Sequence, residues 1–178
     1  MPLFKPRVTP QELGESLFRF LTLKRTRGTP LTEVVAGLAG CRGLNLDSER
    51  VLLELKLLAA CAADYQLGQL VRLRTISQEQ SNTALEAYIK GLTMNVATLA
   101  PQDLVRLLRD RIPAYYESFN AWLYRETRPT NGRNPVAEVF AKFCGVDVPH
   151  EGLVAQVQIE AHYLFAVTTG VLENVKIK

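Results

Sequence analysis

The chain has 178 residues, of which 47% are hydrophobic and 22% are charged, values that are ordinary for a soluble globular protein. A chain of this length can bury a core without disulfides or metal ions, and its apolar content excludes disorder over the whole length. The net charge of +3 is too weak to indicate a nucleic-acid surface, so we expect no nucleic acid among the partners.

Helix-start signals recur along the sequence. Most combine a capping side chain with proline at the first helical position, or with Glu or Gln three residues later. They occur at residues 9–12, 29–30, 47, 77–80, 101–103 and 134–135, and a last helix is expected after Pro149. Together they predict about seven helices.

The helix that follows Asp47 is unusual because it is apolar on nearly every side. Over residues 47–67 only Glu54, Lys56 and Asp64 interrupt the apolar run. A helix without a polar face has to be surrounded by other helices, so we place this helix at the centre of the fold.

Residues 1–178 are therefore predicted to form one all-α domain, a helical bundle without a convincing strand. Pro113 is expected to kink or divide the helix that contains it, and the last helix is expected to reach the C-terminus. A break between subdomains, if the chain has one, is expected in the loop-like segment 127–134, which is rich in Gly, Pro and Asn.

Cysteine usage and hydropathy favour the cytoplasm. Cys41, Cys61 and Cys144 are odd in number and widely spaced, which is typical of a reducing compartment. The first residues contain no apolar signal segment, and no window approaches the length and apolarity of a membrane span.

Motifs that carry chemistry are absent from the sequence. Only His150 and His162 are present, and no zinc spacing, phosphate-binding glycine loop or nucleophile elbow occurs. We predict no metal site and no cofactor, and we regard an enzyme as the less favoured class. A catalytic pocket assembled from distant helices stays open.

An aromatic segment is the first candidate site. Tyr115, Phe119 and Trp122 follow one helical stripe, with Tyr116 beside it, and Arg125 and Arg128 come next. Core packing is the favoured interpretation. The alternatives are a pocket for an anionic or aromatic ligand lined by all six residues, or a surface for a partner protein.

The C-terminal helix is the second candidate. Val157, Ala161, Leu164, Thr168, Val171 and Val175 alternate in steps of four and three, which is a short heptad seam. This seam either packs inside its own domain or pairs with another helix, most simply in a two-fold homodimer.

Two classes of function remain. The preferred class is a non-enzymatic helical interaction or regulatory module that self-associates or binds another helical protein. The alternative is a small-molecule pocket, binding or catalytic, built from the aromatic segment and its arginines.

Overall fold

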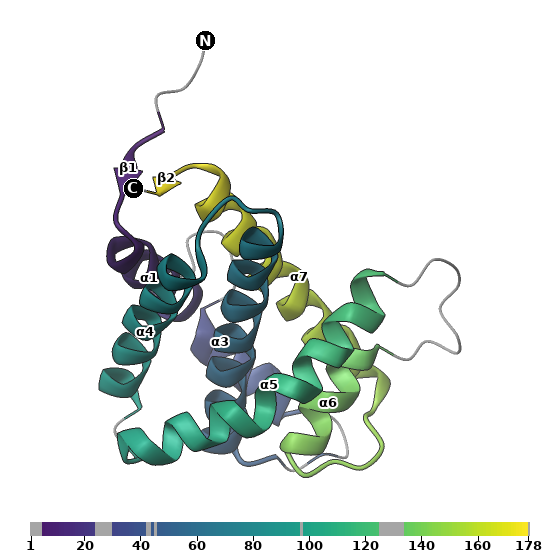
Figure 1. Ribbon diagram of the computed structural model, residues 1–178. Coiled ribbons are helices and arrows are strands. Elements are labelled where there is room, and N and C mark those ends of the chain that lie inside the picture. Colours follow the sequence, from purple (N-terminus) through teal and green to yellow (C-terminus); the bar gives the residue numbers. More distant parts are fainter. Residues whose placement is uncertain are drawn as a thin grey trace.

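The computed structural model of the chain describes residues 5–23, 30–41, 44, 46–96, 98–124 and 134–177. Within these residues there are seven α-helices, one π-helical turn and two very short strands (Figure 1), which confirms the prediction of an all-α helical bundle. The elements are β1 (Arg7–Val8), α1 (Pro10–Phe18), η1 (Arg19–Leu23), α2 (Leu31–Ala39), α3 (Ser48–Arg72), α4 (Gln78–Asn95), α5 (Pro101–Leu123), α6 (Pro135–Phe143), α7 (Glu151–Glu173) and β2 (Lys176–Ile177).

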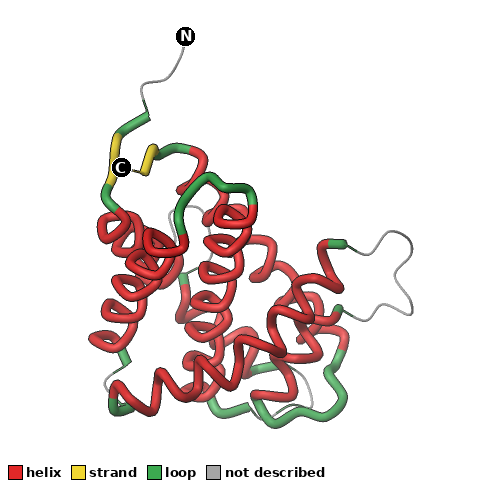
Figure 2. The backbone as a smooth tube through the Cα atoms, in the orientation of Figure 1, coloured by secondary structure: helices red, strands yellow, loops and turns green. Residues whose placement is uncertain are grey.

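The central helix is α3, as predicted from its apolar sequence. It begins at the expected cap, because a side-chain oxygen of Asp47 accepts a hydrogen bond from the backbone N–H of Glu49 at 2.9 Å. It contacts α2, α4, α5, α6 and α7, and Figure 2 shows it running through the middle of the bundle. Its run of small residues, Ala59 to Ala63, is buried, so neighbouring helices approach its backbone closely.

Helices α1 and α4 lie side by side (Figure 1), and both begin with the predicted capping boxes, at Thr9 and Ser77. A Cβ at Gly14 of α1 would collide with the carbonyl oxygen of Ala84 in α4, so glycine is needed for this close approach. In α2, the expected cap Thr29 lies outside the described residues, and the helix begins after Pro30.

Three sequence predictions about the fold need correction. Of the two outcomes expected at Pro113, a kink or a division, division is wrong: α5 runs without interruption from Pro101 to Leu123, with Pro113 exposed and Tyr115 buried. Helix α7 stops at Glu173 instead of reaching the C-terminus. The chain then forms β2, which pairs in parallel with β1, so a minimal strand pair exists where none was expected.

The predicted break near residues 127–134 falls outside the described residues, except for Asn134. The helices on either side of it, α5 and α6, contact each other. None of the described helices has the length and apolar character needed to cross a membrane.

Candidate functional site

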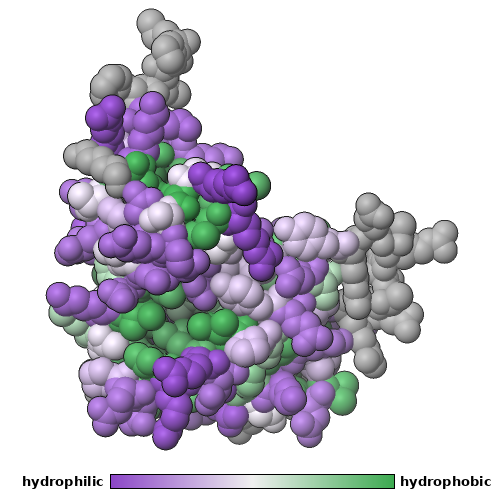
Figure 3. All heavy atoms as spheres, viewed as in Figure 1, coloured by the Kyte–Doolittle hydropathy of each residue, from purple (hydrophilic) through white to green (hydrophobic). Residues whose placement is uncertain are grey.

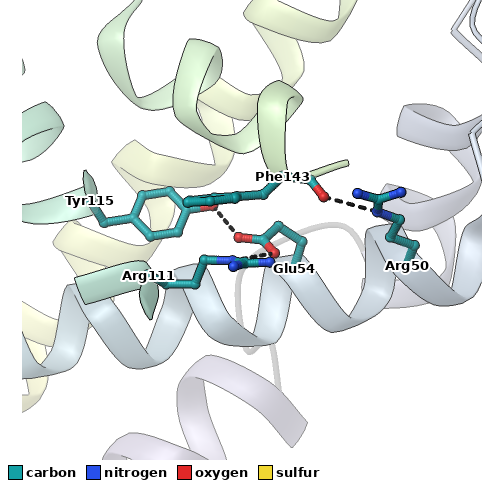
Figure 4. Close-up of polar contacts among 5 residues, drawn as sticks. All are labelled: Arg50, Glu54, Arg111, Tyr115 and Phe143. Atoms are coloured by element: carbon teal, nitrogen blue, oxygen red, sulfur yellow. Dashed lines mark hydrogen bonds and ion pairs between the residues drawn. The ribbon is translucent and has the colours of Figure 1, made fainter. Parts of the chain in front are cut away.

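A buried carboxylate joins helices α3 and α5. Glu54 of α3 is only 3% exposed. The hydroxyl of Tyr115, on α5, donates a hydrogen bond of 2.7 Å to one of its oxygens, and Nε of Arg111 lies 3.3 Å from the other (Figure 4). Both oxygens of this buried acid are therefore satisfied from α5, which is the condition for keeping a carboxylate inside a helical core.

The same cluster holds the end of α6. The guanidinium of Arg111 lies over the ring of Phe143, 3.8 Å from its centroid, and Nε of Arg50 donates a hydrogen bond of 2.9 Å to the Phe143 carbonyl (Figure 4). That carbonyl belongs to the last residue of α6, where the helix leaves acceptors without a partner inside the helix. Arginines from α3 and α5 therefore fix where α6 ends.

The chemistry of this cluster favours a structural role. Burial raises the pKa of Glu54, and the hydrogen bond from Tyr115 and the charge of Arg111 offset part of that rise. Burial also raises the pKa of the Cys144 thiol to about 12 and that of Cys61 well above its ordinary value. Thiols held in this way stay protonated and are poor nucleophiles at neutral pH.

Helix α6 and the start of α7 form the walls of a groove whose ends are fixed by caps. Asn134 accepts hydrogen bonds from the backbone N–H groups of the first turn of α6, and Nδ1 of His150 accepts one from Gly152 at the start of α7. Between them, Gly145 ends α6 with φ of +89°, a left-handed conformation that favours glycine. The loop from Val146 to Pro149 is therefore set by both helix ends.

This α6–α7 groove has a volume of about 900 Å³. Five apolar residues line it, and one of them, Val148, is 78% exposed. The apolar lining consists of Val139, Val148, Pro149, Val154 and Ala155. Several apolar residues that line one groove form the kind of surface that a partner buries.

The charged lining of the groove is predominantly acidic. It consists of Glu138, Asp147 and Glu151 together with one basic residue, Lys142. Three carboxylates against one ammonium group leave an excess of two negative charges around an apolar floor. A ligand with both positive charge and apolar surface matches this lining better than an anion does.

The structure places the predicted aromatic site mainly inside the core. Tyr115 and Phe119 are fully buried, whereas Tyr116 and Trp122 are half-buried. The Tyr116 hydroxyl donates a hydrogen bond of 3.0 Å to Asp64, so both tyrosine hydroxyls bind carboxylates of α3. Arg125 and Arg128, the basic half of the predicted site, lie outside the described residues.

A smaller groove of about 460 Å³ is lined by Leu123 and Tyr124, the residues that directly follow Trp122. Its aromatic lining comes from Tyr65, Tyr124 and Phe165, on α3, at the end of α5 and on α7. None of the predicted aromatic residues lines it. Trp122 nevertheless reaches it indirectly, because its ring centroid lies 5.4 Å from that of Phe165.

The structure turns most of the predicted heptad seam towards the interior. Four of its residues are buried within the chain itself, where α7 contacts α2, α3 and α6. These four are Val157, Ala161, Leu164 and Thr168. Val171 and Val175 are half-buried and pack against the same core. The inner stripe is therefore already occupied, and a second chain could not reach it without opening the bundle.

Another apolar surface lies between α4 and α5. Figure 3 shows apolar side chains gathered there, over α3. Half-buried side chains such as Leu85 and Ile89 of α4 and Ile112 of α5 pack against the core from these helices.

Comparisons with protein-family models, with curated proteins and with solved structures find no match for this chain. Among the described residues, no group of three or more His, Cys, Asp or Glu side chains is placed to hold a metal ion.

Proposed function

We propose that this protein is a non-enzymatic interaction module whose α6–α7 groove binds a short basic segment of a protein through an apolar anchor. The observation that carries the proposal is the combination of an exposed apolar residue, Val148, with a surrounding excess of carboxylates in one groove. The three free cysteines of the protein support a cytoplasmic location, because thiols stay reduced there.

The groove suits recognition of a peptide better than catalysis. Among the described residues, its lining contains neither cysteine nor histidine. Its rigid walls reduce the entropy that is lost when a partner binds, because α6 is capped at both ends and held by Arg50 and Arg111. The apolar floor supplies affinity, and the carboxylates supply orientation and selectivity.

Fluorescence anisotropy with a labelled peptide of alternating arginine and leucine tests this proposal. We expect the peptide to bind, and we expect a counterpart with glutamate in place of arginine to bind at least tenfold more weakly. The substitution Val148→Lys should weaken binding at least tenfold, because it removes an anchor contact worth roughly 1.5 kcal/mol or more and adds a positive charge that repels the arginines. Equal binding of both peptides, or binding that Val148→Lys leaves unchanged, would contradict the proposal.

A matched control comes from Met94, which is 71% exposed on α4, away from the groove. Met94→Lys introduces the same charge as Val148→Lys at another exposed apolar position, so it should leave binding of the arginine peptide unchanged. A loss of binding as large as that caused by Val148→Lys would show that net charge, and not the groove, controls the interaction.

A second candidate is binding of an aromatic small molecule in the groove between Tyr65, Tyr124 and Phe165. Its volume of about 460 Å³ lies within the range of ligand pockets, and aromatic rings from α3, the end of α5 and α7 meet there. Trp122, the only tryptophan of the chain, packs on Phe165 and should report occupancy. Titration with anilinonaphthalene sulfonate should quench its fluorescence saturably, and Phe165→Ala should abolish the saturation. An unsaturable response would exclude this second candidate.

A further inference from the structure

The turn between α3 and α4 presents an apolar side chain between two basic ones. Leu73 is 73% exposed, and the side chains of Arg72 and Arg74 on either side of it are also exposed. The ion pairs found among the described residues, Arg106 with Asp103 and Arg111 with Glu54, do not involve these two arginines. The turn therefore displays an apolar side chain between two positive charges, and in the described part of the same chain no carboxylate forms an ion pair with either arginine.

The backbone of this turn is unfavourable for the residue that it carries. Arg74 has a φ of +55°, and it is the only described residue other than glycine with a positive φ. Its N–H donates to the Val71 carbonyl, and the N–H of Thr75 donates to the Leu70 carbonyl, both at 2.9 Å. This is the helix-ending motif in which glycine is preferred. A strained arginine at such a position points to a role other than stability.

The turn and the α6–α7 groove are complementary in chemistry. The turn offers Leu73 between two arginines, and the groove offers exposed Val148 among Asp147, Glu151 and other carboxylates. Pairing them would bring opposite charges together around a contact between apolar side chains. This is the pattern expected of a specific contact whose charges fix the orientation.

The two surfaces lie too far apart to meet within one chain. The groove lies beyond the start of α3, where Arg50 holds the end of α6, whereas the turn follows the end of α3 (Figure 1). The 25 residues of α3 span about 37 Å at 1.5 Å per residue. Any contact between turn and groove must therefore join two molecules.

We infer that the basic segment bound by the α6–α7 groove is the α3–α4 turn of a second copy of this chain. The inference rests on the proposed function of the groove. Because the two surfaces differ, the contact is head-to-tail, and each molecule keeps a free turn at one end and a free groove at the other. Association then continues beyond the dimer into chains or a closed ring. The contact is small, so it belongs to the weak class of interfaces.

Two single substitutions at exposed positions test this arrangement by analytical ultracentrifugation at concentrations up to about 1 mM, a range suited to weak contacts. Leu73→Asp disables the turn and leaves the groove intact, whereas Val148→Lys places a positive charge against the partner's arginines, disables the groove and leaves the turn intact. We expect wild type to form dimers and larger species as concentration rises, and fewer of them at high salt. Each variant alone should be monomeric, and an equal mixture should form one-to-one dimers and nothing larger.

The mixture is decisive because only a head-to-tail contact can be restored by combining two different defects. Met94→Asp is the control and should associate like wild type. Monomeric wild type at the highest concentration, a mixture that stays monomeric, or a variant that dimerises alone would each overturn the inference. If wild type is monomeric while the arginine peptide still binds the groove, the groove has its proposed function and only the identity of its partner is wrong.

Discussion

The inner and outer faces of α7 look alike in sequence, but they differ in what covers them. The inner face places Leu164 and its neighbours against α3, with 4% of Leu164 exposed, whereas Ile159 on the outer face is 65% exposed. The heptad spacing of the inner face fits either packing inside its own domain or pairing with a second chain. Regular spacing, however, shows only that a stripe packs against a helix, and here that helix belongs to the same chain.

A glutamate placed on the inner face of α7 should change the free energy of unfolding more than any other substitution proposed, whereas a glutamate on the outer face should hardly change it. Leu164→Glu places a charge inside the core and should lower the free energy of unfolding by more than about 4 kcal/mol. The matched change Ile159→Glu should alter it by less than about 0.5 kcal/mol, because that side chain faces solvent. Urea unfolding followed by circular dichroism measures both. A stable, folded Leu164→Glu protein with altered self-association would instead favour a dimer built on the inner face.

The cluster around Glu54 extends the comparison of covered and exposed positions, because Glu54 is an ionisable group inside the core. Glu54→Gln leaves a single acceptor oxygen for two donors, the Tyr115 hydroxyl and Nε of Arg111, and should lower the free energy of unfolding by about 1–3 kcal/mol. Burial raises the pKa of Glu54 in the folded protein, so its contribution to stability is present in acid and is lost as pH rises through that raised pKa. The difference between wild type and variant should therefore be widest near pH 4 and narrow towards neutral pH.

Urea unfolding at a series of pH values measures this difference. A gap that widens as pH rises would mean that Arg111 and Tyr115 outweigh burial and that the pKa of Glu54 is lowered. Glu54 would then act as a strong anchor of α5 under neutral conditions.

Substitutions at two exposed helix ends, Gly145 after α6 and Arg74 after α3, should change stability by smaller amounts and in opposite directions. Gly145→Ala forces an alanine into a φ of +89° and should destabilise the fold by about 1–2 kcal/mol. Arg74→Gly relieves the strained arginine and should stabilise it by about 1 kcal/mol. Thermal unfolding tests both. A destabilising Arg74→Gly would show that the arginine side chain supports its own fold, which would weaken its assignment to a contact between molecules.

The helix starts were predictable from sequence because capping is local. Thr9, Asp47, Ser77 and Asn134 all accept the backbone hydrogen bonds that their positions imply. The central position of α3 was also predictable, since an apolar helix has no face to offer solvent. That α5 continues through Pro113 was not predictable, because sequence does not show that this proline lies on an exposed face with buried neighbours on either side.

The candidate site was much harder to predict. The α6–α7 groove combines residues 138–142 with residues 147–158, and whether they share a surface depends on how two helices pack. Glu54 carried a usable signal, since a lone acid in an apolar helix needs buried partners. Its partners Arg111 and Tyr115 lie 57 and 61 residues away, and no local pattern connects them.

Amide hydrogen exchange with and without the arginine–leucine peptide distinguishes binding at the groove between α6 and α7, which we propose, from binding at the inner face of α7. We predict slower exchange at residues 146–155 and little change at residues 157–168, whose side chains include the buried stripe. Slowing confined to residues 65–70 and 123–124 would place binding in the aromatic groove and contradict the proposal.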